Sequence, residues 1–183
     1  MDAVLNTERL SLKPMTEEDI SFIVDLETRL ETHQYETGEI PTSEKASEQC
    51  RWFIDNQKLL PAEGAVKYII KNMGAERVGY VSLVCNWEVT REWEIGYGLL
   101  SEFWGNGYAT EAVHKVISFG FEKLNIHKLM AFINAENRNS VALAKRIGMV
   151  QEGHMREARL VNGNWNDEYV FTLLKSDLGQ IER

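Results

Sequence analysis

Two glycines one residue apart, Gly105 and Gly107, stand directly before a stretch whose apolar residues recur at helical spacing. The first turn of a helix has backbone N–H groups without partners and carries about half a positive charge, so anions bind there when the backbone can come close. Glycine permits that approach because it has no side chain. The pattern indicates a pyrophosphate site on these backbone N–H groups. The candidate residues are Gly105, Asn106, Gly107, Tyr108, Ala109 and Thr110.

Other nucleotide-binding motifs fit this stretch poorly. A P-loop requires Gly-Lys-Ser/Thr, whereas Gly107 is followed by Tyr108 and Ala109. A dinucleotide fingerprint requires a third glycine where Thr110 stands, and no suitable strand-helix-strand unit opens on it. Taken alone, the two glycines also fit a tight turn that binds no ligand.

Glu94 is the candidate proton acceptor. Successive residues of a strand point to opposite faces, so Glu94 shares one face with Gly96 and Gly98, while the apolar odd-numbered residues share the other. Two missing side chains would leave space for a substrate amine beside the carboxylate. Glu88 and Glu92 are weaker alternatives, and a solvated glutamate beside a bulge is the structural alternative.

The elements that would position these residues alternate between strand and helix periodicity. Predicted strands span 9–15, 65–73, 76–88, 92–100 and 128–134, and a hairpin over 153–174 turns at Asn162 and Gly163. Predicted helices span about 17–30, 43–60, 107–124 and 138–147. The strand-helix-strand-helix passage from about 92 to 147 implies one parallel strand pair in an otherwise antiparallel sheet. Such a sheet can open between its parallel strands.

Three motifs together resemble one family. The segment 94–113 resembles the acetyl-CoA-binding segment of the GNAT acetyltransferases, whose pattern is Gln/Arg-x-x-Gly-x-Gly/Ala. The segment 134–149 and the hairpin are similar to the RimJ/RimL-like branch, which has Asn-x-x-Ser and then a helix ending Lys-x-x-Gly-Phe. The resemblance spans nearly the whole chain. It departs at Glu102, where Gln or Arg is frequent, at Gly98, where Trp is common, and at Met149, which replaces Phe.

The resemblance implies an α/β (α+β) fold in a single domain over 1–183. That fold is a mixed, mostly antiparallel, seven-stranded sheet flanked by about four helices. The implied enzyme moves an acetyl group from acetyl-CoA to a primary amine by direct attack. The acceptor would be a protein N-terminal α-amine or a small cationic amine such as a polyamine. The alternative is a catalytically silent module that senses acyl-CoA.

The resemblance also implies roles for individual residues. The pantetheine arm would pair with the strand near Leu99 and Leu100, and Asn137 would hold its amides. Ser140 would supply a proton or hydrogen bond to the departing thiolate, and Glu94 would act as the base directly or through water. A helix N-terminal cap is the alternative for Asn137 and Ser140, and it is compatible with catalysis.

Glutamates at 27, 31, 36 and 39 fall at the end of the first predicted helix and in the following loop, where GNAT proteins commonly shape the acceptor site. They could attract a cationic amine. The alternative is a solvated acidic face.

Composition and charge narrow the choice of substrate and of cellular location. A net charge of −8 and a pI near 5.1 argue against nucleic acid and suit a cationic substrate. The sequence shows neither a signal peptide nor an apolar run of membrane-spanning length, so we expect a cytoplasmic protein without membrane contact. Cys50 and Cys85 lack metal-ligand spacing, and we expect core thiols and no metal. Monomer and homodimer both stay open.

Overall fold

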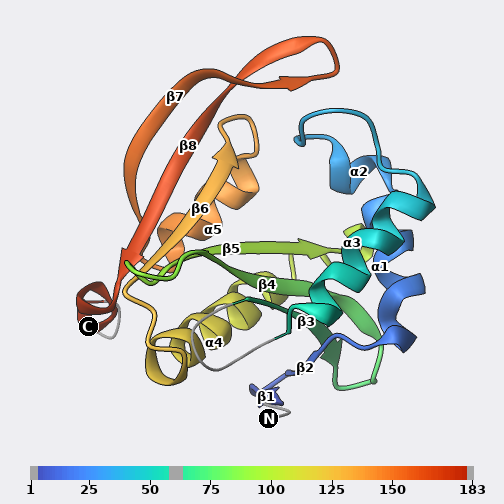
Figure 1. The fold of residues 1–183 in the computed structure, drawn as a ribbon, viewed down its shortest axis with the longest axis horizontal. Coiled ribbons are helices and arrows are strands. Elements are labelled where there is room, and N and C mark those ends of the chain that lie inside the picture. Colours follow the sequence, from blue (N-terminus) through green and yellow to red (C-terminus); the bar gives the residue numbers. More distant parts are fainter. Residues whose placement is uncertain (1–3, 58–63, 181–183) are drawn as a thin grey trace.

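The computed structural model describes residues 4–57 and 64–180. Within them, one open sheet of eight strands runs in the order β1-β2-β3-β4-β5-β6-β8-β7 (Figure 1). The strands are β1 Leu5–Asn6, β2 Leu10–Pro14, β3 Ala65–Asn72, β4 Arg77–Trp87, β5 Glu92–Leu99, β6 Lys128–Asn134, β7 Val150–Val161 and β8 Asn164–Leu174. The predicted mixed α/β class is confirmed. The eighth strand is the short β1, which a turn closed by Thr7 N–H and Leu10 O (2.9 Å) folds back onto β2.

The helices follow the predicted order with two changes. They are α1 Ile20–Glu27, α2 Leu30–His33, α3 Ser43–Asp55, α4 Tyr108–Lys123 and α5 Arg138–Arg146, with 3₁₀ turns at Glu17–Asp19, Ser101–Phe103 and Lys175–Gln180. The single helix predicted over 17–30 is wrong at its end. Thr28 Oγ1 bonds Val24 O (2.8 Å) and Arg29 is extended, which separates α1 from α2. The second predicted helix ends at Asp55, and residues 58–60 of that prediction lie outside the described part.

The two faces of the sheet have separate cores. On one face, α4 buries Val113, Val116 and Ile117 against strand residues such as Trp93 and Ile95. On the other face, α1 and α3 cover a smaller cluster of Met15, Ile23, Cys50 and Ile69. Helices therefore hold β2 to β5 from both sides, which makes this half of the sheet a fixed platform (Figure 1).

The sheet opens between β5 and β6. These strands pair in parallel through only three residues of each, from Glu92 opposite Lys128 to Glu94 opposite Met130. Beyond that point β5 stays with β4, while β6 pairs with β8 and moves away (Figure 1). The predicted parallel pair and the opening beside it are confirmed.

Candidate active site

The glycine loop sits where the sequence predicts it, at the N-terminus of α4. Gly107 is the N-cap residue with φ of 78°, and Gly105 has φ of 76°. A Cβ at Gly105 would meet no atom within 4 Å, so the backbone angle rather than crowding requires glycine here. The loop is exposed. Its first-turn N–H groups are therefore accessible to an anion.

Arg9, from the segment between β1 and β2, holds this loop in place. Its guanidinium donates to Asn106 O (3.0 Å) and pairs with Glu111 in the first turn of α4 (2.6 Å). Thr7 Oγ1 donates to the same carboxylate (2.6 Å). Burial raises the pKa of Glu111, but the bonds from Thr7 and Arg9 outweigh it and lower that pKa overall. The sequence analysis missed Arg9, because it acts on a loop about a hundred residues away.

A hollow of about 740 Å³ adjoins the same helix N-terminus. Its lining includes Arg9, Lys115 and Arg146, and the Arg146 guanidinium donates to Thr110 Oγ1 (3.2 Å). Three basic side chains thus stand beside the predicted anion site. Lys115 and Arg146 were also missed, since each lies among the polar residues of an ordinary amphipathic helix.

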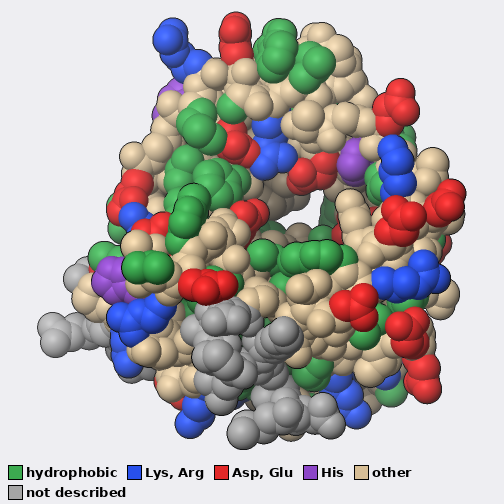
Figure 2. Space-filling view, in the orientation of Figure 1, with side chains coloured by type: hydrophobic (Ala, Val, Ile, Leu, Met, Phe, Trp, Pro, Cys, Tyr) green, Lys and Arg blue, Asp and Glu red, His purple; other side chains and the backbone are tan. Residues whose placement is uncertain are grey.

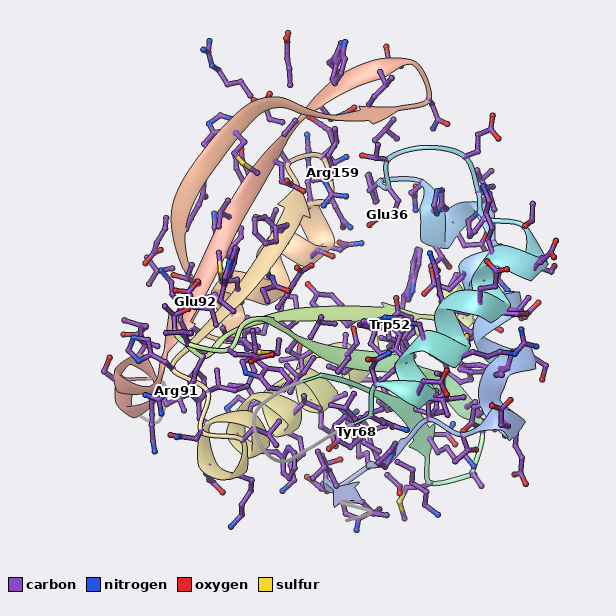
Figure 3. The ribbon with its side chains drawn as sticks, in the orientation of Figure 1. Glu36, Trp52, Tyr68, Arg91, Glu92 and Arg159 are labelled. Atoms are coloured by element: carbon purple, nitrogen blue, oxygen red, sulfur yellow. The ribbon has the colours of Figure 1, made fainter. Side chains whose placement is uncertain are left out.

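Glu94 occupies the last paired position of β5, where the opening begins. Its carboxylate accepts a hydrogen bond from Asn86 Nδ2 (3.2 Å), and the residue is half-buried. The predicted face is confirmed, because the neighbours Trp93 and Ile95 are buried on the α4 side. Glu92 lies at the start of the strand, away from the opening (Figure 3).

The expected space beside Glu94 is partly absent. A Cβ at Gly98 would lie 2.9 Å from the ring of Tyr80, so the tyrosine already fills that space. A Cβ at Gly96 would lie 3.0 Å from Ser82 Oγ. Gly98 therefore accommodates a neighbouring strand's ring, and room for an acceptor lies toward β6.

Ser140 and Tyr97 meet on the other face of β5. Asn137 Oδ1 accepts from Ser140 N (3.1 Å), so the capping interpretation of Asn137 is confirmed. The hydroxyl of Tyr97 donates to Ser140 O (3.4 Å). Burial raises the pKa of Tyr97, which keeps it a protonated phenol. Tyr97 supplies a second hydroxyl on the face that strand alternation assigns to the odd-numbered residues.

Internal hydrogen bonds occupy part of the backbone at Leu99 and Leu100, where the pantetheine arm is predicted to pair. Leu100 N donates to Val78 O (3.0 Å), and Leu99 O accepts from Trp104 Nε1 (2.8 Å). These backbone groups are already engaged within the protein. The β5 edge from Ile95 to Leu99 has no strand partner on its β6 side in the described residues.

Two of the four glutamates on the acceptor side, Glu31 and Glu36, have polar partners, while Glu39 is exposed. Ser101 Oγ donates to Glu31 (3.2 Å), and Glu36 pairs with Arg159 of β7 (2.8 Å). Burial, and after it the nearby Glu27 carboxylate, raises the pKa of the Tyr80 phenol.

Lys67 of β3 lies buried on this same side of the sheet, opposite Ser82. Its ammonium stands 4.5 Å from the ring centre of Phe53 and 4.2 Å from that of Tyr80. Burial lowers the pKa of Lys67, while Glu27 and Cys50 act in the opposite direction. Sequence analysis assigns no role to this lysine, because strand alternation alone does not show which strand residues α3 covers.

Cys50 is buried and Cys85 is half-buried. Neither cysteine forms a disulfide, and Cys85 packs against the main core. The described residues hold no cluster of three or more side chains suited to a metal ion. No helix in the described part of the chain is long and apolar enough to cross a membrane.

Comparison with known proteins assigns the family. The profile described as Acetyltransferase (GNAT) domain matches residues 9–150, and the chain belongs to this family of acetyl-CoA-dependent N-acetyltransferases. A protein named uncharacterized N-acetyltransferase p20 from Bacillus licheniformis is 30% identical over 173 residues, which cover 94% of this chain and 97% of that protein.

Two solved structures share the fold. Spermidine N-acetyltransferase from Vibrio cholerae, in complex with CoA and spermine, matches with a TM-score of 0.82 at 22% identity, over 94% of this chain and 99% of that one. Ribosomal-protein-S5-alanine acetyltransferase from Vibrio fischeri matches with a TM-score of 0.81 at 21% identity, over 97% and 99% of the two chains.

Proposed function

We propose that this enzyme transfers the acetyl group of acetyl-CoA directly to a primary amine, either a protein N-terminal α-amine or a small cationic amine such as a polyamine. The observation that carries the proposal is the end of β5–β6 pairing at Glu94 and Met130. A thioester lodged in that opening can be approached from both faces of β5. Glu94 stands on one face, and Tyr97 and Ser140 meet on the other.

The cofactor fits the chain's own groups. Its pyrophosphate would bind the N–H groups from Gly105 to Thr110, with positive charge supplied by Lys115 and Arg146. Its pantetheine arm would run along the β5 edge from Ile95 toward the start of α5. Arg9 would keep the loop in its binding geometry through Asn106.

The reaction needs two proton transfers. The acceptor arrives as an ammonium, and Glu94 takes its proton directly or through one water. The neutral nitrogen then attacks the thioester carbonyl and the C–N bond forms. The C–S bond breaks as the nitrogen gives up its second proton, which is relayed through a hydroxyl toward the departing sulfur. The CoA thiolate leaves with a proton or a hydrogen bond from Ser140 or Tyr97. No covalent enzyme intermediate is needed.

The acceptor class is set by local side chains rather than by the fold. Neighbours named for spermidine and for ribosomal protein S5 match this chain with nearly equal TM-scores. With pKa values of about 8 for an α-amine and about 10.4 for a lysine-like amine, deprotonation at pH 7 differs by about 3 kcal/mol. Glu94 therefore has a smaller deprotonation free energy to overcome when the acceptor is an α-amine.

Initial-rate kinetics with both substrates varied test direct attack. A ternary complex predicts double-reciprocal lines that intersect, and Cys85→Ala should keep turnover within a few-fold of wild type. Parallel lines, together with loss of turnover in Cys85→Ala, would show a covalent route and contradict the proposal.

A further inference from the structure

The opening beside β5 is bridged at its outer side by one ion cluster. Figure 2 shows an opening through the molecule between the β7–β8 hairpin and the segment that holds α2, with acidic and basic side chains on its rim. In Figure 3, Arg159 from the hairpin and Glu36 from the segment between α2 and α3 point toward each other across this space. An amine that enters here meets these two side chains.

Arg159 holds two carboxylates at once. Its Nη1 lies 2.8 Å from Glu36 Oε2, and its Nε and Nη2 both contact Glu168 Oε1. The Glu168 side chain is 10% exposed and that of Arg159 is 18% exposed, whereas Glu36 is 54% exposed. A carboxylate as buried as Glu168 requires a cation or donors beside it, and Arg159 supplies them.

Local structure directs Arg159 inward. The register between β7 and β8 is irregular from Met155 to Arg159, and Glu157 within that stretch has φ of 51°. A bulge of this kind re-aims the side chains that follow it. On the facing segment, Asn134 Nδ2 donates to Tyr35 O (3.0 Å), which fixes the chain next to Glu36.

We propose that Arg159 is a specificity-determining residue: it occupies the carboxylate pair that a polyamine would need, so that the enzyme prefers a peptide or protein α-amine. This inference rests on the proposed function. A polyamine needs a carboxylate for its second ammonium while its first lies near Glu94, and Glu36 and Glu168 both already pair with the Arg159 guanidinium.

The test compares Arg159→Gln with wild type, using acetyl-CoA and either spermidine or a lysine-free peptide with a free N-terminus. Glutamine keeps one donor for Glu168 but removes the charge. We expect the ratio of kcat/KM for spermidine to kcat/KM for the peptide to rise at least tenfold. Arg159→Lys should keep the wild-type ratio, because it restores the cation. The double variant Arg159→Gln with Glu168→Gln should show most of this rise in the ratio cancelled, because the carboxylate that would bind the second ammonium is then absent.

A second variant leaves Arg159 in place, so the test does not depend on the folding of Arg159→Gln. Asn166 lies opposite Arg159 in the hairpin, and Asn166→Asp adds one carboxylate in excess of the guanidinium. It should raise the same ratio several-fold. A wild type that prefers spermidine, or ratios unchanged in both variants, would overturn the inference while leaving acetyl transfer intact. No thiol release with either amine, despite CoA binding, would overturn the proposed function itself.

Discussion

Glu94 is held by the Asn86 amide at the step where β5 loses its partner, so its carboxylate has a fixed position at the opening. If it accepts the amine proton, Glu94→Gln should lower kcat by roughly a hundredfold or more. The loss should be larger for spermidine than for an α-amine peptide, because the spermidine nitrogens hold their protons more strongly. Rates followed against pH with both amines measure this difference.

Glu92→Gln is the matched control for that prediction, because Glu92 lies on β5 at the paired end of the strand (Figure 3). It should change kcat little. Equal losses for both amines in Glu94→Gln would remove Glu94 as the base and leave it a structural role.

The buried Lys67 side chain makes the stability of the folded protein depend on pH. Burial lowers its pKa in the folded protein, so the unfolded chain binds more protons between that lowered pKa and the ordinary value of about 10.4. The free energy of unfolding therefore rises with pH across this window by about 1.4 kcal/mol for each pH unit. It falls by the same amount for each unit when the pH is lowered. Lys67→Met removes this dependence while still packing against Phe53 and Tyr80.

Denaturant unfolding at about pH 9.5 and about pH 7 checks this expectation. The stability of Lys67→Met relative to wild type should increase toward the lower pH. Lys13→Met is the control, because water reaches the Lys13 side chain in the folded state, and its difference from wild type should stay constant. An equally constant difference for Lys67→Met would contradict the argument.

The positions of single residues were predictable only where the local sequence pattern determines them. Strand alternation assigned Glu94 to its face, and helix-entry chemistry assigned the glycines and the Asn137 cap. Arg9 and Arg159 were not found, because each acts on a segment about a hundred residues or more away. No local period encodes such contacts.

At the scale of elements, the loop before α4 tests the phosphate cradle. Gly107→Glu places a carboxylate at the helix N-terminus, where the dipole and the basic side chains of Lys115 and Arg146 favour the cofactor's phosphates. Affinity for CoA, measured by calorimetry, should fall at least a hundredfold, or about 2.7 kcal/mol. Unchanged affinity would rule out this loop as the cradle.

Gly163→Glu separates that effect from backbone strain. Gly163 has the same φ of 78°, and a Cβ there meets nothing within 4 Å. It lies in the hairpin turn between β7 and β8, far along the chain from α4. This variant should carry a similar strain and bind CoA like wild type.

Most elements followed from periodicity, and the exceptions have local causes. The stripe of α4 was evident because six buried residues recur on one side of it. The break between α1 and α2 was missed because Thr28 and Arg29 do not interrupt the apolar spacing. The two residues of β1 are too few to show an alternation.

For the whole molecule, the sheet is two platforms joined at three residue pairs. Helices on both sides fix β2 to β5, and β6 carries β8 and β7 away from them. The sequence predicted the parallel pair from its strand-helix-strand order. It could not show how soon the pairing ends, because that depends on packing of α5 and the hairpin against β6 rather than on β5 or β6 alone.

Release of free CoA thiol tests the central claim most directly. The purified protein would be incubated with acetyl-CoA and a lysine-free peptide, and thiol would be followed above the hydrolysis background with mass analysis of the peptide. The account predicts release that saturates with peptide concentration and a single acetyl group on the N-terminal amine. Background release alone, across peptides, polyamines and aminoglycosides and with CoA bound, would contradict acetyl transfer to an amine at this opening.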